Sequence, residues 1–383
     1  HGGDQTERFE AAMQERNTRI VHDGQPELTH ACDKCTRIYQ NDDGTCSRVE
    51  VAVIDGLTMG HPCCAEPTCF NPLPRNRNKK RYCDHHDDRH SICAIVGCTA
   101  PVTKNSMTCS DLKHSEMERL HLERGKSIFR LRQLSSRAKG IDTSNMDEAE
   151  ALLDMDENEW FEVLDSGDVR VYDATAPESS TGQLDEKMAS ASARCEGKSE
   201  TGNKKIRAQF TRQRTHNKEI LVRLCGVIVA RATLKSAEGV SSVMDMVKHV
   251  YTRPRARKIN HLIYDSACIA RTLKKVQDDP WWQDVGLTVD TFHFKCKHKE
   301  SDINCQLYCN PADYPELVVG DGWYFNSSTC EQTNAWFGGY NAIVREMRST
   351  KYNYFLDEVI IKRNTVLVHR LDASGEGRLL YFT

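Results

Sequence analysis

Apolar and polar positions change their spacing several times along this 383-residue chain. Residues 5–20 predict a short polar helix. Residues 49–53 alternate (Val-Glu-Val-Ala-Val), which predicts a strand, and Asp55-Gly56 directly afterwards is typical of a turn. Residues 115–138 place Ile128, Leu131 and Leu134 at helical spacing, so a helix is expected there.

The strand-like spacing returns beyond residue 200. Strands are predicted over 205–212 and 220–233, a helix over 237–250, and a short apolar strand over 261–265 that ends in Asp265. A helix over 266–276 and a strand over 287–294 follow. This order of strands and helices predicts an α/β domain with a mixed sheet.

Residues 139–200 separate these two regions. They are rich in acidic residues, Gly, Ser and Thr, and their one strongly apolar island is at 160–164. We interpret them as an acidic linker with one short helix. The expected domains are therefore a small amino-terminal module over 1–138, the linker over 139–200, and a mixed-sheet domain over 201–383.

Composition narrows the class of protein. No run of eighteen apolar residues occurs, the first residues are polar, and 17 cysteines stand beside histidines at the spacing of metal ligands. We therefore expect no membrane span, no signal peptide and a reducing compartment, the cytosol or the nucleus. The net charge of −3 conceals basic clusters at 204–218 and 253–258.

A repeated ligand pattern dominates residues 64–114. Two C-x4-C pairs, each followed by Pro and an aliphatic residue, are each closed by a Cys and a His. Disulfides would not require the histidines, and four Cys or His ligands make a closed zinc site. The predicted zinc ligands are Cys64, Cys69, Cys83 and His86 in the first half, and Cys93, Cys98, Cys109 and His114 in the second.

Two further ligand sets are expected. Cys32 and Cys35 form a C-x2-C knuckle whose partners stay open among His30, Cys46, His61 and Cys63. The second predicted set is His293, His298, Cys305 and Cys309, in which Cys296 could replace one histidine. Structural Zn²⁺ at two to four sites is thus the expected cofactor.

Two acids in the second domain are candidates for chemistry. Asp265 follows a strand and could simply cap the next helix. It could equally hold a divalent ion together with Glu331, which lies on a predicted helix near Trp336 and Phe337, because two-metal phosphoryl transfer needs converging carboxylates.

These blocks resemble a known family. Tyr264-Asp265-Ser-Ala-Cys268, Phe292-His293 with His298, Cys305 and Cys309-Asn310-Pro311, and Glu331-Gln332 before Trp336 look like the blocks of the Kyakuja-Dileera-Zisupton (KDZ) transposases of fungi. The tandem zinc unit, with Asp55-Gly56 ahead of it and Thr108-Cys109 within it, resembles the cysteine cluster associated with those transposases. The two matches cover about residues 30–125 and 200–365.

The resemblance implies a ribonuclease H-like domain and a DDE-type active site, in which three acids bind two Mg²⁺ or Mn²⁺ ions and direct attack on a DNA phosphate. Asp265 would be the second acid and Glu331 the third. The first belongs on the opening strand, yet the nearest candidate, 204–210, has no carboxylate. Asp290 is a substitute, and a catalytically inactive regulatory protein is the alternative.

Duplex DNA is the expected partner, bound mainly through its backbone, because cations contact phosphates without reading bases. The cations expected to bind DNA are Lys204, Lys205, Arg207, Arg212, Arg214, Lys218, Arg253, Arg255, Arg257 and Lys258. Nuclear localisation follows. A protein-interaction module, an RNA-binding regulator and a homo-oligomer stay open.

Overall fold

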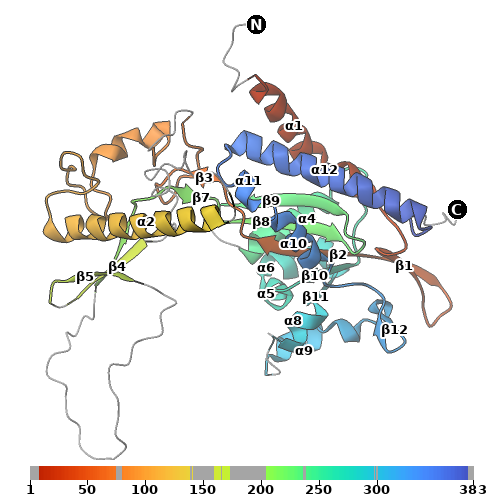
Figure 1. Ribbon diagram of the computed structural model, residues 1–383. Coiled ribbons are helices and arrows are strands. Elements are labelled where there is room, and N and C mark those ends of the chain that lie inside the picture. The colour runs from red at the N-terminus through yellow and green to blue at the C-terminus, as the bar shows by residue number, and fades with distance from the viewer. Residues whose placement is uncertain are drawn as a thin grey trace, which may run out of the picture. The chain divides into compact units, whose positions relative to one another are not determined.

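The computed structural model describes residues 8–74, 80–138, 140, 159–164, 166–172, 204–235, 239–296, 298 and 301–377 (Figure 1). The chain divides into two compact units: residues 1–61 with 215–383, here unit 1, and residues 62–214, here unit 2. This division differs from the predicted boundaries, because the first 61 residues belong with the second half of the chain.

The central sheet of unit 1 explains that difference. Its strands are β1 (Thr36–Gln40), β2 (Cys46–Leu57), β8 (Asn217–Arg223), β9 (Ile228–Leu234), β10 (His261–Tyr264) and β11 (Gly286–Thr288). The order is β11-β10-β2-β8-β9, with β1 paired to β2. Strand β2 is antiparallel to β8 and parallel to β10, which is parallel to β11. Strand β2, ahead of the zinc unit in sequence, is thus central.

Helices cover both faces of this sheet. One face packs Ile54, Leu221 and Leu262 against Val243 and Val247 of α4 (Val240–Tyr251). On the other face, α10 (Thr329–Gly338) and the long α12 (Ser349–Ala373) bury apolar residues of β2 and β8 (Figure 1). The apolar residues that form this second layer are Val53, Ile220, Val222, Phe337, Leu356 and Ile360. Burial on both sides accounts for the strongly apolar character of β8.

Several shorter elements complete unit 1. Helix α1 (Glu10–Asp23) and the 3-10 turn Pro26–Thr29 precede β1, and the remaining elements lie beyond β10. They are α5 (Ala267–Thr272), α6 (Lys274–Gln277), α7 (Pro280–Gln283), α8 (Thr291–Cys296), α9 (Ile303–Tyr308), 3-10 turns at Pro311–Asp313 and Pro315–Leu317, β12 (Val318–Val319), β13 (Gly322–Trp323) and α11 (Asn341–Val344).

Unit 2 contains the tandem cysteine repeat and its supports. These are β3 (Pro62–Cys63), the 3-10 segment η3 (Asp84–Ser91), α2 (Leu112–Ala138), β4 (Glu159–Val163), β5 (Val169–Tyr172), β6 (Lys204–Ala208) and β7 (Gln213–Arg214). Strands β5, β4 and β6 form one small sheet, and β3 pairs with β7. Met117 of α2 and Phe161 of β4 share a core with Ile95 of the repeat.

Most predicted elements are confirmed, with four corrections. Residues 160–163 of the apolar island belong to strand β4, because Phe161 and Val163 alternate into the core of unit 2. The predicted strand over 220–233 is the β8–β9 hairpin, which turns at Cys225-Gly226. Residues 266–276 form two short helices that meet at Leu273. The predicted strand over 287–294 ends at Thr288, and α8 begins at Thr291.

Candidate metal centres

The backbone of unit 2 repeats itself as its sequence does. In the first half the Cys64 amide donates to the Asn71 carbonyl (3.0 Å), and in the second the Cys93 amide donates to the Ala100 carbonyl (2.9 Å). Each C-x4-C segment also forms an isolated bridge to its proline, Cys63 to Pro72 and Ile92 to Pro101. Equivalent turns therefore present equivalent pairs of thiols.

The first half gathers Cys64, Cys69, Cys83 and His86, with all four ligand atoms within 4.8 Å of one another. The Cys69 and Cys83 sulfurs are 3.8 Å apart, and His86 Nδ1 lies 3.5 Å from Cys83 Sγ. Zinc bonds of about 2.3 Å to sulfur and 2.0 Å to nitrogen place tetrahedral ligands roughly 3.5–3.8 Å apart. The set therefore has the spacing of a zinc site.

The second half repeats this geometry with Cys93, Cys98, Cys109 and His114. The Cys98 and Cys109 sulfurs are 3.9 Å apart, and His114 Nδ1 lies 3.6 Å from Cys93 Sγ. Asp111 Oδ1 accepts hydrogen bonds from the amides of Lys113 and His114 at the start of α2. The helix start thus fixes the fourth ligand.

Ionisation in the first half suits metal binding. Burial acts to raise the pKa of Cys83, but hydrogen bonds, led by that with His86, lower it to about 7. Burial raises the pKa of Cys64 to about 12. Because a zinc ligand must be a thiolate, metal binding would release protons here.

A third set lies in unit 1 and differs from the prediction. Cys268 of α5, His298 and Cys305 of α9 have ligand atoms within 4.8 Å of one another. His298 Nδ1 is 3.1 Å from Cys305 Sγ and 3.8 Å from Cys268 Sγ. Burial, then the charges of Cys268 and Cys309, raise the pKa of Cys305 to about 12, so Cys309 is also close. Cys268 is therefore the member of this set that the sequence analysis expected to be His293. Cys296, which was the other option for that position, is exposed.

The knuckle Cys32–Cys35 also joins a set of four. Its partners are His30, one of the predicted options, and Cys225 from the β8–β9 turn. The other predicted options do not join it: Cys46 is exposed at the start of β2, His61 packs against the Tyr352 ring, and Cys63 belongs to unit 2. Cys225 is 190 residues further along the chain, so no local spacing could indicate it.

Three aspartates occupy matching positions on three neighbouring parallel strands of unit 1. Tyr264 pairs with Ile54, and Ile263 pairs with Thr288. The same register aligns Asp265, directly after β10, with Asp55, which is still inside β2, and with Asp290, two residues beyond β11. Adjacent strands lie about 4.8 Å apart, so these carboxylates stand at one edge of the sheet.

His293 connects this edge to Glu331. Its Nδ1 lies 2.8 Å from Asp265 Oδ1 and 3.5 Å from Asp290 Oδ2, and its Nε2 lies 3.2 Å from Glu331 Oε1. Asp290 Oδ2 accepts from the amides of Phe292 and His293 and thereby starts α8. The predicted zinc ligand His293 therefore lies among carboxylates, apart from the Cys268 set.

Asp55 is the acid that the sequence interpretation missed. Its Oδ2 accepts a 2.8 Å hydrogen bond from Asn334 Nδ2, one helical turn from Glu331 on α10. Burial, then the charges of Asp55, Glu219 and Asp265, hold the pKa of the Cys330 thiol well above its usual range. The Asn334 contact thus links Asp55 to α10, the helix that carries Glu331. Asp265 lies beside His293, and the carboxylate-free segment 204–210 lies outside the central sheet of unit 1, because β6 belongs to unit 2.

Asp55-Gly56 is not a turn but part of β2. A Cβ atom on Gly56 would lie 2.4 Å from Asn217 Nδ2 and 2.5 Å from Glu219 Oε1, both on the neighbouring buried strand. Glycine therefore leaves room here for the ends of these two buried polar side chains, which would have to move if a Cβ atom were present. Asp55-Gly56, a dipeptide typical of turns, therefore lies near the end of the central strand β2.

The predicted DNA-binding cations are dispersed. Lys218 is fully buried with its Nζ 4.7 Å from the Tyr352 ring centre, burial holds its pKa well below the usual value, and Arg212 is buried too. Their burial leaves neither side chain accessible to a DNA phosphate. Lys204, Lys205, Arg207 and Arg214 belong to unit 2, and only Lys204 and Lys205 among them are well exposed. Residues 253–258 precede β10, whose first residue lies about 13 Å along the strand from Asp265. Among them, Arg253 donates to the Val21 carbonyl, and Arg255 is exposed.

Together, these observations define a mixed α+β protein with several Cys/His clusters that could bind structural zinc. Residues 53–120 match the family described as the CxC6-like cysteine cluster associated with KDZ transposases. This match confirms the predicted relationship to KDZ-associated proteins. No curated protein and no solved structure matches the chain. Within the described residues, no helix has the length and apolar character needed to cross a bilayer.

Proposed function

We propose that the protein cleaves or joins DNA strands with divalent metal ions held by Asp55, Asp265 and Glu331. The observation that carries this proposal is the register of β2, β10 and β11, which brings Asp55, Asp265 and Asp290 to one edge, with Glu331 reached through His293. Carboxylate oxygens are the ligands that Mg²⁺ and Mn²⁺ prefer. The missing first acid of the DDE pattern is then Asp55.

The proposed fold is ribonuclease H-like. Supporting it, β2, β8 and β9 form an antiparallel meander, and β10 and β11 then add in parallel beside β2. Helix α4 makes the connection to β10, and α10 carries the last acid. On this proposal unit 2 is an insertion between the first and second strands of the sheet.

The carboxylates have distinct expected tasks. Asp55 and Asp265, adjacent in the sheet, would bridge the ions, and Glu331, 45% exposed at its side chain, would complete the site from α10. Bound divalent ions would activate a water or a 3′-hydroxyl and stabilise charge on the DNA phosphate. Asn334 holds the Asp55 carboxylate in place, and His293 orients Asp265 and Glu331.

DNA binding is part of the same proposal. Lys204 and Lys205 on β6 and Arg255 ahead of β10 are exposed cations suited to phosphate contacts. Such contacts make affinity fall steeply as salt rises. A nuclear location and structural zinc in the tandem unit complete the proposal.

The test is a cleavage and strand-transfer assay on duplex DNA with Mg²⁺ or Mn²⁺. We expect Asp265→Asn to reduce the rate at least about 100-fold, because it removes one charged ligand from the metal site. Asp43→Asn, in the exposed turn between β1 and β2, is the matched control. Activity unchanged in Asp265→Asn, or absent from wild type with every divalent ion, contradicts the proposal.

A second candidate function is a catalytically inactive protein that binds DNA or protein partners. It is favoured by His293, whose ring nitrogens already lie 2.8 Å from Asp265 Oδ1 and 3.2 Å from Glu331 Oε1. This alternative predicts binding without cleavage. A gel-shift titration at two ionic strengths separates DNA binding, which salt weakens, from a protein-interaction role without DNA binding.

A further inference from the structure

We infer that His30, Cys32, Cys35 and Cys225 hold a structural zinc that fastens the β8–β9 turn to the segment ahead of β1, with the buried Arg223 as its counter-charge. This zinc would belong to unit 1 and be independent of the tandem repeat. The inference does not depend on the proposed DNA chemistry.

The four ligand atoms already cluster. All lie within 4.8 Å of one another, and the Cys32 and Cys35 sulfurs are 3.5 Å apart. That separation is too long for a disulfide of about 2.05 Å and suits two ligands of one zinc. His30 Nε2 is buried, and among the described residues it has no hydrogen-bond partner. A metal would give this nitrogen a partner.

Local backbone structure presents these ligands. The amides of Cys35 and Thr36 both donate to the Cys32 carbonyl at 3.0 Å, so the knuckle is a tight turn with its thiols on one side. The opposite side comes from the hairpin: the Gly226 amide donates to the Arg223 carbonyl (2.7 Å), and Gly226 has φ of +93°. Since side chains other than glycine rarely adopt that φ, Gly226 is required for Cys225 to face the knuckle.

The charges around the cluster alternate in sign. Zinc with three thiolates and one neutral imidazole carries a net charge of −1. Arg223, 2% exposed at its side chain, lies at the end of β8, two residues before Cys225 and beside this cluster. The buried guanidinium of Arg223 would then lie between two negative charges, that of the zinc cluster and that of Glu50.

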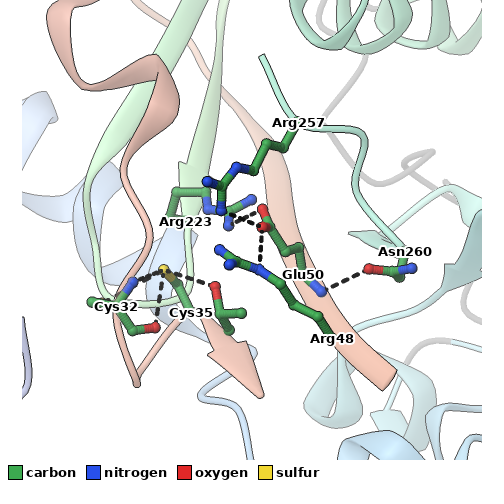
Figure 2. A network of polar contacts seen from close by, with 8 residues as sticks. Cys32, Cys35, Arg48, Glu50, Arg223, Arg257 and Asn260 are labelled. Atoms are coloured by element: carbon green, nitrogen blue, oxygen red, sulfur yellow. Dashed lines mark hydrogen bonds and ion pairs between the residues drawn. The ribbon is translucent and has the colours of Figure 1, made fainter. Parts of the chain in front are cut away.

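Glu50 balances Arg223 on its other side. Figure 2 shows Arg48, Arg223 and Arg257 grouped around the Glu50 carboxylate on β2, close to Cys32 and Cys35. Glu50 oxygens lie 2.7 Å from Arg223, 2.8 Å from Arg48 and 3.8 Å from Arg257. Arg257, predicted to bind DNA, is therefore a partner in this network.

The position in the sheet indicates a structural role. Arg223 pairs with Ala52, whereas Asp55 pairs with Ile220, so the cluster lies at the end of the sheet away from the carboxylates. Four protein ligands leave no open coordination position for a substrate. The zinc would join residues that have the whole of unit 2 between them in sequence.

The test is the zinc content of the full chain, measured by elemental analysis after exhaustive dialysis. We expect Cys225→Ser to hold one zinc fewer than wild type. Cys46→Ser, an exposed cysteine outside every cluster, should leave the content unchanged. An unchanged zinc content in Cys225→Ser overturns the inference.

A second measurement covers the case in which Cys225→Ser does not fold. Wild-type protein is treated with an alkylating reagent, with and without a zinc chelator, and each modified cysteine is identified by mass spectrometry. We expect the half-exposed Cys225 to be protected until the chelator is added, whereas Cys46 reacts in both samples. Reaction of Cys225 in untreated protein would contradict a bound metal.

Discussion

The tandem zinc unit and the carboxylate edge are built in opposite ways. Each zinc set in unit 2 takes its ligands from about twenty consecutive residues, and a repeated backbone turn presents them. The carboxylate edge takes Asp55, Asp265, Asp290 and Glu331 from four distant segments that meet only when the sheet forms. The first kind of site depends on metal for its folding, and the second depends on strand pairing.

This difference separates the causes of stability in the two units. Unit 1 has a large apolar core on both faces of its sheet, whereas the first zinc set in unit 2 has around it only a few buried residues, among them Ala65 and Tyr82. Zinc, once bound, would therefore supply free energy that burial alone does not supply in the first half of the repeat. Four predictions test this contrast, in order of decreasing effect.

The largest effect is expected from Cys83→Ser. Loss of this ligand removes zinc from the first half of the repeat, which costs on the order of 10 kcal/mol of binding free energy and unfolds that half. Zinc content and proteolysis within residues 62–214 report the change. Cys296→Ser, an exposed cysteine, is the control. A Cys83→Ser protein that stays folded and keeps its full zinc content would contradict this difference between the two units.

A smaller effect is expected in unit 1 from Asp357→Ala. Arg231 Nη2 lies 2.7 Å from Asp357 Oδ2, both side chains are buried, and Gln25 donates to the same carboxylate. Removing Asp357 leaves a buried cation and should lower the free energy of unfolding by about 3–5 kcal/mol. Glu123→Ala, at an exposed ion pair with Arg119, should cost far less, because solvent and salt screen this pair. Denaturant titration measures the free energy of unfolding of both variants. Equal losses for Asp357→Ala and Glu123→Ala would refute the claim that the buried Arg231–Asp357 pair stabilises unit 1.

The assignment of His293 to the carboxylates is tested next. We expect His293→Ala to keep the full zinc content but to slow DNA cleavage by roughly 10–100-fold, because Asp265 and Glu331 lose their shared partner. His298→Ala should instead lose one zinc. Zinc loss in His293→Ala would restore the original prediction that this residue is a zinc ligand.

The smallest effect concerns acid stability. The hydrogen bond from His261 lowers the pKa of Glu316 below its ordinary value of 4.5. Its contribution is therefore present above about pH 4.5 and is lost as the pH falls through the lowered pKa. Glu316→Gln should remove about 1 kcal/mol or less at neutral pH and flatten the acid limb of the stability curve. If the free energy of unfolding of Glu316→Gln falls at acid pH as it does in the wild type, the Glu316–His261 pair does not stabilise the folded protein.

Sequence reasoning succeeded where the chemistry is local. The repeated C-x4-C spacing predicted all eight tandem ligands, because the turns that hold them are made by adjacent residues. Sequence reasoning did not indicate Asp55 as a member of the carboxylate edge. The place of β2 in the sheet depends on its pairing with β8 and β10, which are more than 150 residues away. Cys225 and Cys268 were missed as ligands for the same reason. The apolar island at 160–164 is too short for its period to distinguish a strand from a helix.

Binding of Mn²⁺ to the carboxylate edge, followed by electron paramagnetic resonance, tests the central claim most directly. We predict that Asp55→Asn and Asp265→Asn each weaken Mn²⁺ binding by about tenfold or more, while Asp43→Asn leaves it unchanged and all three keep the wild-type zinc content. Wild-type Mn²⁺ affinity in Asp55→Asn would contradict the claim that the strand ahead of the zinc unit completes the site.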